Sequence, residues 1–169
     1  MNFRKHYFIA LLFLVACASM EERKRRFDNH ERVSSPKASV EEYLDFEWPI
    51  KSFRLGEVYG WRTKKRMHEG VDLGAPRGTP VFAAEAGEVI YVGDRLRGFG
   101  NMVIVDHGDG WSTVYAHLIR ATVRRGEELR KGDPLGLVGK TGRASGYHLH
   151  FEIRKGSDPM DPLLFLPAR

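Results

Sequence analysis

The sequence has a single cysteine among its 169 residues, so no disulfide can form within the chain. It also has little uninterrupted hydrophobic sequence: the run FIALLFLVA at residues 8–16 is far too short to span a bilayer as a helix. Positive charge is only in small excess, because the sequence has 27 Lys and Arg and 22 Asp and Glu. A net charge of +5, spread along the chain, does not indicate nucleic-acid binding, and we expect no nucleic-acid partner.

The composition supports a globular domain. With 42% hydrophobic residues the chain can bury a core, and 18 Gly and 8 Pro predict many turns. This balance excludes a coiled coil, a collagen-like fibre and a fully disordered chain. The length fits one ordinary domain with additional sequence.

The hydrophobic run at the N-terminus follows two basic residues, as in a secretory signal peptide. It ends in LVAC at residues 14–17, which resembles the lipobox of bacterial lipoproteins. The resemblance implies that a signal peptide, residues 1–16, is removed and that Cys17 is lipidated and holds the protein on a membrane. Because Ala18 and Ser19 replace the Asp of an inner-membrane retention signal, we expect the outer membrane rather than the inner one.

Residues 17–47 are polar and predict a linker, with a short helix over 40–46. The globular domain is expected over 48–165. Its apolar segments are short and interrupted by Gly or Pro, and no convincing helix of ten residues follows Trp48. A hairpin with its turn at 107–110 and a strictly alternating strand at 147–154 predict an all-β, antiparallel domain.

Histidines carry the strongest chemical signal. His148 and His150 lie two apart in the predicted strand, so their imidazoles share one face. His68 and Asp72 are four apart and share a face if their segment is extended, and His117 lies near the end of another strand. Two His and one carboxylate leave one position open on a tetrahedral Zn²⁺, which is typical of a catalytic site. A further histidine within reach can accept a proton or stabilise developing charge.

The segment His68-Glu69-Gly-Val-Asp72 has some likeness to the HExxH zinc helix, in which the glutamate is the general base. That motif requires a helix, and the glycine-broken segment does not favour one. In an extended chain Glu69 points away from the two ligands. We therefore expect it to be solvated or to act behind the ligands.

Together these segments resemble the LytM or lysostaphin-type zinc peptidases, peptidase family M23, over about residues 48–162. HxxxD at 68–72, YAHL at 115–118 and HLH at 148–150 match three motifs of the family in order. The resemblance implies a compact barrel-sandwich-like sheet with short loops around a groove. It also implies a single Zn²⁺ ion bound by His68, Asp72 and His150. Two catalytic histidines that do not bind the metal, His117 and His148, would flank the ion.

Three further residues match positions near the family's substrate groove. Asn101 corresponds to a groove Asn, although a turn former before a strand explains it equally well. Tyr115 could assist at the oxyanion, but an aromatic residue in a strand more often belongs to the core. Arg62 matches a frequent Arg that could meet a substrate carboxylate. His107 belongs to a common Asp-His-Gly block and is expected to be structural.

The resemblance implies a monomeric zinc endopeptidase that binds peptidoglycan stem peptides and hydrolyses their cross-links. It leaves open whether the bond is a D-alanyl–diaminopimelyl link or a glycine bridge. A second hypothesis is a non-catalytic module that activates a wall amidase, as in relatives that have lost metal ligands. A third is a biotinyl- or lipoyl-type carrier domain, which does not explain five clustered His and Asp residues.

Overall fold

The computed structural model describes residues 44–64 and 66–168. The predicted signal peptide 1–16, Cys17 and its lipidation, and nearly all of the linker 17–47 lie outside the described residues. Of the helix predicted over 40–46, residues 44–46 are described, and they have no helical structure. No helix in the described part of the chain is long and apolar enough to cross a membrane.

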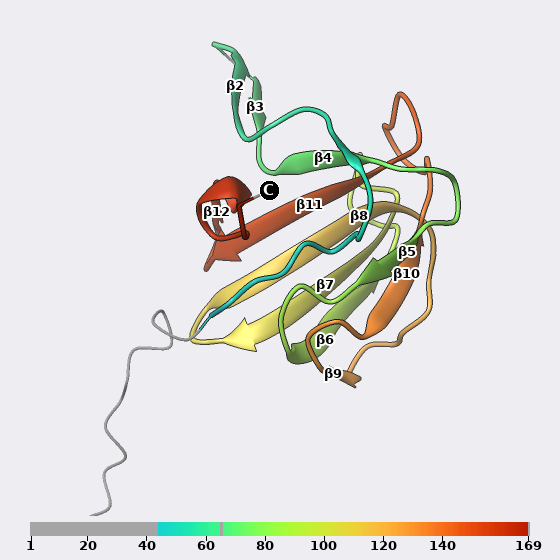
Figure 1. Cartoon of the computed structure of the whole chain (residues 1–169), viewed down its shortest axis with the longest axis vertical. Helices are drawn as coiled ribbons and strands as arrows, with labels where there is room; N and C mark the ends of the chain where they lie inside the picture. Colours follow the sequence, from blue (N-terminus) through green and yellow to red (C-terminus); the bar gives the residue numbers. More distant parts are fainter. Residues whose placement is uncertain (1–43, 65, 169) are drawn as a thin grey trace, which may run out of the picture. The chain divides into compact units, whose positions relative to one another are not determined.

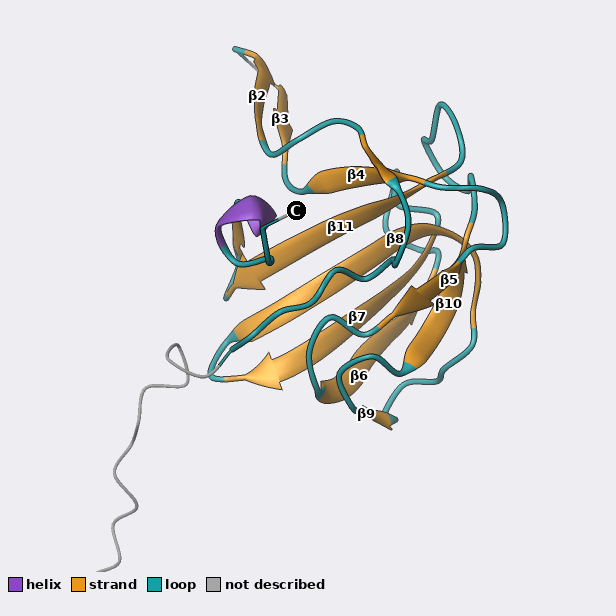
Figure 2. Cartoon of the chain, in the orientation of Figure 1, coloured by secondary structure: helices purple, strands orange, loops and turns teal. Residues whose placement is uncertain are grey.

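Short antiparallel strands make up the domain (Figures 1 and 2). In chain order the described elements are β1 (Arg54–Leu55), β2 (Gly60–Thr63), β3 (Arg66–His68), β4 (Val71–Gly74), β5 (Pro80–Phe82), β6 (Gly87–Gly93), β7 (Asn101–Gly108), β8 (Trp111–Ala121), β9 (Glu128–Leu129), β10 (Pro134–Val138), β11 (His148–Lys155), β12 (Asp158–Met160) and the 3-10 turn η2 (Pro162–Leu164). The predicted all-β, antiparallel fold is confirmed.

One large sheet runs in the order β1-β4-β11-β8-β7-β6-β9. Strand β10 pairs with both β5 and β8, and β12 extends the other end of β11. The hairpin β2–β3 forms a separate two-stranded sheet, and Figure 1 shows it projecting beyond β4. Strands β8 and β11 lie at the centre of the large sheet, so residues on them are held by neighbours on both sides.

The long hairpin β7–β8 was predicted from its turn sequence, and it is present. Its two-residue turn places both Asp109 (φ 47°) and Gly110 (φ 80°) in the left-handed region. Turns of this kind match the right-handed twist of the flanking strands. Strand β8 extends beyond the predicted end at Leu118 to Ala121.

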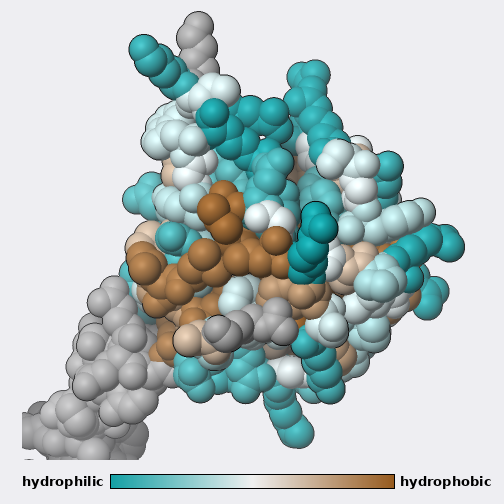
Figure 3. All heavy atoms as spheres, turned by 45° about the horizontal axis from the view of Figure 1, so that its top comes forward, coloured by the Kyte–Doolittle hydropathy of each residue, from teal (hydrophilic) through white to brown (hydrophobic). Residues whose placement is uncertain are grey.

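Strand β8 is buried on both faces over most of its length, which explains why its sequence does not alternate. One face joins the main core, where Tyr115, Phe151 and Leu149 are completely buried. The other face contributes Val114 and Ala116 to a smaller cluster. Hydrophobic residues also reach the surface, and on the face that Figure 3 shows some of them form a patch flanked by hydrophilic side chains.

Gly70 joins the end of β3 to β4 against the backbone of β11. A Cβ at this position would lie 2.2 Å from the Phe151 carbonyl oxygen and 2.9 Å from Glu152 Cγ. Only glycine therefore lets the segment that carries His68 and Asp72 pack this closely against β11.

We expect Gly70→Ala to lower the free energy of unfolding by about 2–4 kcal/mol, because either β11 or the 68–72 segment must shift. Urea denaturation measures the change. Gly146→Ala is the control, since a Cβ there meets nothing within 4 Å. It should change stability by less than about 0.5 kcal/mol. Equal effects of the two substitutions would contradict the packing role of Gly70.

Candidate active site

The register of the sheet brings the predicted metal ligands together. On β11, His150 is directly opposite Asp72 of β4. His68, at the end of β3, approaches both from the adjoining segment. The distances are 2.9 Å from His150 Nδ1 to Asp72 Oδ1, 3.1 Å from His68 Nε2 to Asp72 Oδ1, and 3.1 Å between the two ring nitrogens.

The outer ring nitrogens fix which atoms face this centre. His68 Nδ1 donates to the Val58 carbonyl at 2.9 Å, and a carbonyl can only accept. His150 Nε2 donates to Glu152 Oε1 at 2.9 Å. In the neutral rings, His68 Nε2 and His150 Nδ1 are therefore unprotonated, so two lone pairs face each other and a carboxylate oxygen. A cation fits such a set of acceptors.

The spacing of the three donor atoms also fits one metal ion. Donor atoms bound to a tetrahedral zinc at roughly 2.0–2.1 Å stand about 3.3 Å apart. The observed separations of 2.9–3.1 Å are slightly shorter. His68, Asp72 and His150 can thus hold a metal ion after a small outward movement of their side chains.

The charges of this centre are strongly coupled. Burial alone would raise the pKa of Asp72, but its contacts with the rings of His150 and His68 outweigh burial and hold that pKa well below its usual range. Burial likewise opposes a charge on His150, yet its bonds to Asp72 and Glu152 raise its pKa to about 9. Without a metal, a proton on His150 thus supplies the positive charge that the centre requires.

Behind His150 lies a chain of ionic contacts that the sequence analysis did not identify. Glu152 is only 1% exposed, and its second oxygen, Oε2, accepts from Arg154 Nη1 at 2.5 Å. The same Arg154 nitrogen lies 3.0 Å from Glu69 Oε2. Glu69 lies between β3 and β4, outside any helix, so the segment is not a zinc-binding helix. The alternation of β11 could have indicated Glu152, since it shares a face with His148 and His150.

The two predicted non-ligand histidines face the same centre. Their ring centroids are 4.8 Å apart. His117 Nδ1 donates to the Thr141 carbonyl at 2.8 Å, and His148 Nδ1 donates to the Gly146 carbonyl at 3.0 Å. Each ring therefore keeps Nε2 unprotonated when neutral, and that of His148 lies 3.8 Å from Asp72 Oδ1.

His117 has an unusual backbone conformation, with φ at 61°, in the left-handed region. A histidine there is uncommon, and such strain often accompanies functional positions. The N–H of His117 donates to the Phe99 carbonyl at 2.8 Å, which secures this conformation. Burial lowers the pKa of His117 to about 4, so the ring is neutral at pH 7.

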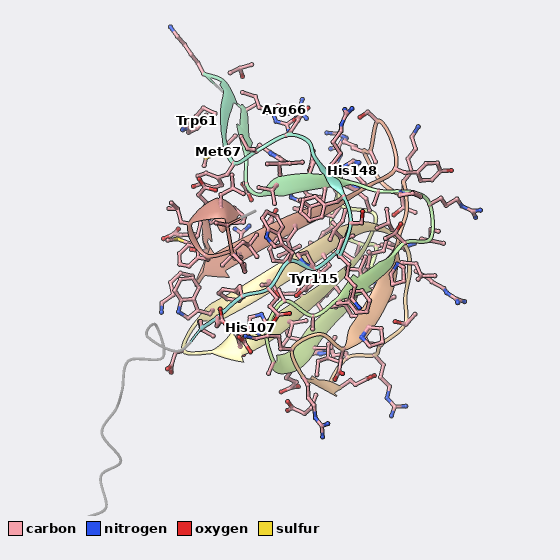
Figure 4. All side chains as sticks on the ribbon, viewed as in Figure 1. Trp61, Arg66, Met67, His107, Tyr115 and His148 are labelled. Atoms are coloured by element: carbon pink, nitrogen blue, oxygen red, sulfur yellow. The ribbon has the colours of Figure 1, made fainter. Side chains whose placement is uncertain are left out.

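A cavity of about 550 Å³ opens above these residues. All five predicted metal and catalytic residues line it, together with Arg62. Arg62 contacts Glu57 and lies 3.8 Å from Asp72 Oδ2. Arg66 and Met67, on the projecting hairpin β2–β3, form part of the same lining (Figure 4).

The structure does not bring Tyr115 to this cavity. Its side chain is completely buried, and its hydroxyl accepts from the Ala84 N–H and from Thr113 Oγ1. Burial raises the pKa of Tyr115 to about 12, so the hydroxyl stays neutral. Of the two interpretations open at the sequence level, the position favours the core.

Asn101 is also directed away from the cavity lining. Its amide nitrogen donates to the carbonyls of Leu118 and Ile119, at 3.3 and 2.8 Å. It thereby ties the start of β7 to the backbone immediately after His117. His107 binds the Ala86 carbonyl and Thr113 Oγ1, and Figure 4 shows it well separated from His148.

The low pKa of His117 predicts a loss of stability in mild acid. Between about pH 6.5 and 4 the unfolded chain binds a proton at this position that the folded chain does not. Stability should therefore fall as the pH falls through this window, by about 1–3 kcal/mol from His117. Urea unfolding of the chelator-treated protein at several pH values measures the loss.

His117→Asn is the matched variant, because Asn tolerates the left-handed region and does not titrate. It should show a smaller loss between pH 6.5 and 4 than the unaltered protein. Identical pH slopes for the two proteins would contradict the assignment.

Comparison with known proteins shows related sequences. The chain is 43% identical over 112 residues to the uncharacterized lipoprotein YgeR of Escherichia coli, covering 66% of this chain and 44% of that protein. It is 38% identical over 120 residues to the DD-carboxypeptidase/endopeptidase Mpg of Neisseria meningitidis (68% and 27% covered). It is 34% identical over 124 residues to the murein hydrolase activator NlpD of Escherichia coli (73% and 32% covered). The chain thus spans less than half the length of each of these relatives.

Among solved structures, a zinc-containing peptidase from Vibrio cholerae is similar, with a TM-score of 0.66 and 28% identity. That match covers 75% of this chain and 40% of the other. Residues 66–162, more than half of the chain, match the sequence pattern of peptidase family M23. The chain therefore belongs to peptidase family M23.

Proposed function

We propose that the protein is a zinc endopeptidase that hydrolyses the peptide cross-links of bacterial peptidoglycan. The observation that carries this proposal is the meeting of three metal-binding atoms and two further histidines in one cavity. The family membership and the names of the relatives Mpg and NlpD support the wall as the target.

The metal would be held by His68 Nε2, Asp72 Oδ1 and His150 Nδ1. A zinc ion there supplies Lewis acidity, which makes water more acidic and polarises a peptide carbonyl. Val58 and Glu152 keep the two imidazoles in the tautomers that present lone pairs to the ion.

His117 and His148 provide the proton transfers. In the neutral state each presents an unprotonated Nε2 to the cavity, which can accept a proton from the attacking water. Once protonated, the same nitrogen can donate to the oxyanion or to the departing amine. The carbonyls of Thr141 and Gly146 orient the rings throughout, because they accept from Nδ1 in either state.

We further propose that the protein is held at the cell envelope, on the outer membrane, by a lipid on Cys17. The sequence LVAC at 14–17 supports this, as do relatives named as lipoproteins. Such an anchor would place the domain against the wall.

A second candidate is an activator of another wall hydrolase, because one relative is named a murein hydrolase activator. Activation by contact does not require a metal centre or two histidines that face it. The complete set of five residues and their ordered tautomers favour catalysis.

Glu152→Gln tests the metal centre. The amide keeps the size of the side chain but removes the charge that orients His150 and attracts a cation. We expect zinc affinity to fall about 10–100-fold, as measured by competition with a chromophoric chelator. Glu88→Gln, on the exposed part of β6, is the control and should leave zinc affinity unchanged. An unaltered affinity in Glu152→Gln would contradict its role.

Catalysis is tested with purified peptidoglycan sacculi and the zinc-loaded protein, with released fragments identified by mass spectrometry. We expect zinc-dependent loss of cross-linked dimers, inhibited by chelation. His150→Ala should lose both zinc and cleavage. His117→Asn should keep zinc but lose at least about 100-fold in rate, since it removes proton transfer only.

If the folded, zinc-loaded protein cleaves nothing, the endopeptidase proposal is wrong and the activator remains. Loss of zinc in His117→Asn would instead contradict the division into ligands and catalytic pair.

A further inference from the structure

The cavity wall beside His117 is built from two loops, residues 94–100 between β6 and β7 and residues 139–147 between β10 and β11. The Arg143 N–H donates to the Gly98 carbonyl at 2.8 Å. The loops approach so closely that a Cβ at Gly142 would lie 2.5 Å from Gly98 O and Gly100 N. The two loops thus form one continuous wall rather than two independent flaps.

This wall carries two arginines. Arg97 and Arg143 are both exposed, and both line the cavity that holds the five metal and catalytic residues. The Arg143 side chain extends across Gly98, its Cδ being 3.9 Å from the position of a Cβ there. Because Gly98 follows Arg97 in the chain, the Arg143 side chain approaches the backbone next to Arg97.

Neither arginine has an internal acidic partner among residues 44–64 and 66–168. Among the other charged residues that line the cavity, Arg62 contacts Glu57 and Glu69 binds Arg154. Arg66, on the separate hairpin β2–β3, also has no acidic partner among the described residues, but it does not belong to this wall. The positive charge of Arg97 and Arg143 is thus available to a ligand. Guanidinium groups favour carboxylates, which they bind with two parallel hydrogen bonds.

We propose that Arg97 and Arg143 form a carboxylate-binding subsite, and that the preferred substrate carries a free carboxylate close to the scissile bond. The inference rests on the proposed peptidase function and sharpens its substrate class. Direct cross-links between stem peptides carry such carboxylates, whereas bridges made only of glycine carry none. The subsite therefore favours a direct cross-link over a glycine bridge.

The subsite is tested by binding, with a stem peptide that has no cross-link to cleave. The zinc-loaded protein is titrated with this fluorescently labelled peptide in two forms, one with free carboxylates and one with the same groups as carboxamides. We expect the acid form to bind about 10–100-fold more tightly, as fluorescence polarisation measures. The preference should shrink as salt is raised, because the guanidinium groups are exposed.

The double variant Arg97→Gln/Arg143→Gln should bind both forms with similar affinity. Arg95→Gln is the matched control, since Arg95 is an exposed neighbour in the same loop that does not line the cavity. It should keep the full preference. Thermal melting of all three proteins verifies that they are folded.

Equal affinity for acid and amide in the unaltered protein, or an undiminished preference in the double variant, would overturn the subsite. The outcome is independent of turnover. A preference for the acid form without cleavage of sacculi would support the subsite and reject the endopeptidase. Cleavage of sacculi without any preference for the acid form would support the endopeptidase and reject the subsite.

Discussion

The arrangement of the cavity depends on the close approach of three electron-rich atoms, His68 Nε2, Asp72 Oδ1 and His150 Nδ1. These atoms lie 2.9–3.1 Å from one another. The lone pairs of these atoms repel one another unless a positive charge, a proton or a metal ion, lies between them. The protein nevertheless fixes both imidazoles in this orientation, through Val58 on one ring and Glu152 on the other. The orienting groups are thus as much a part of the centre as the donors. Glu152 is buried, and the guanidinium of Arg154 balances its negative charge.

The sheet holds these three atoms in place. Asp72 and His150 are cross-strand partners, and β11 is held on its other side by β8. A shift of one residue in the β4–β11 register would turn His150 to the opposite face. Close packing at Gly70 opposes such a shift, since the 68–72 segment lies directly on the backbone of β11.

Much of this could be predicted from the sequence because the signals are local. Alternation in β11 places His148 and His150 on one face, and the Asp-Gly turn at 109–110 defines the longest hairpin. The roles of Asn101 and Tyr115 could not be separated in this way, since a turn, a groove and a core accept the same residue types. The bonds of Asn101 to Leu118 and of Tyr115 to Ala84 connect residues 17 and 31 positions apart, and only the folded chain brings these residues together. The left-handed conformation of His117 has no sequence signal, because that region is otherwise favoured by Gly and Asn.

The proposed metal centre and the proposed carboxylate subsite lie on two kinds of structure. The proposed ligands lie on or next to paired strands, where a small displacement would separate the donor atoms. Arg97 and Arg143 lie on loops whose side chains are free to change without altering that register. The division is incomplete, because the same loops hold His117: Phe99 accepts from its N–H and Thr141 from its ring. If the wall binds substrate as proposed, changes of its side chains would alter which substrate binds. Changes of its backbone, above all at Gly100 and Gly142, would also move His117.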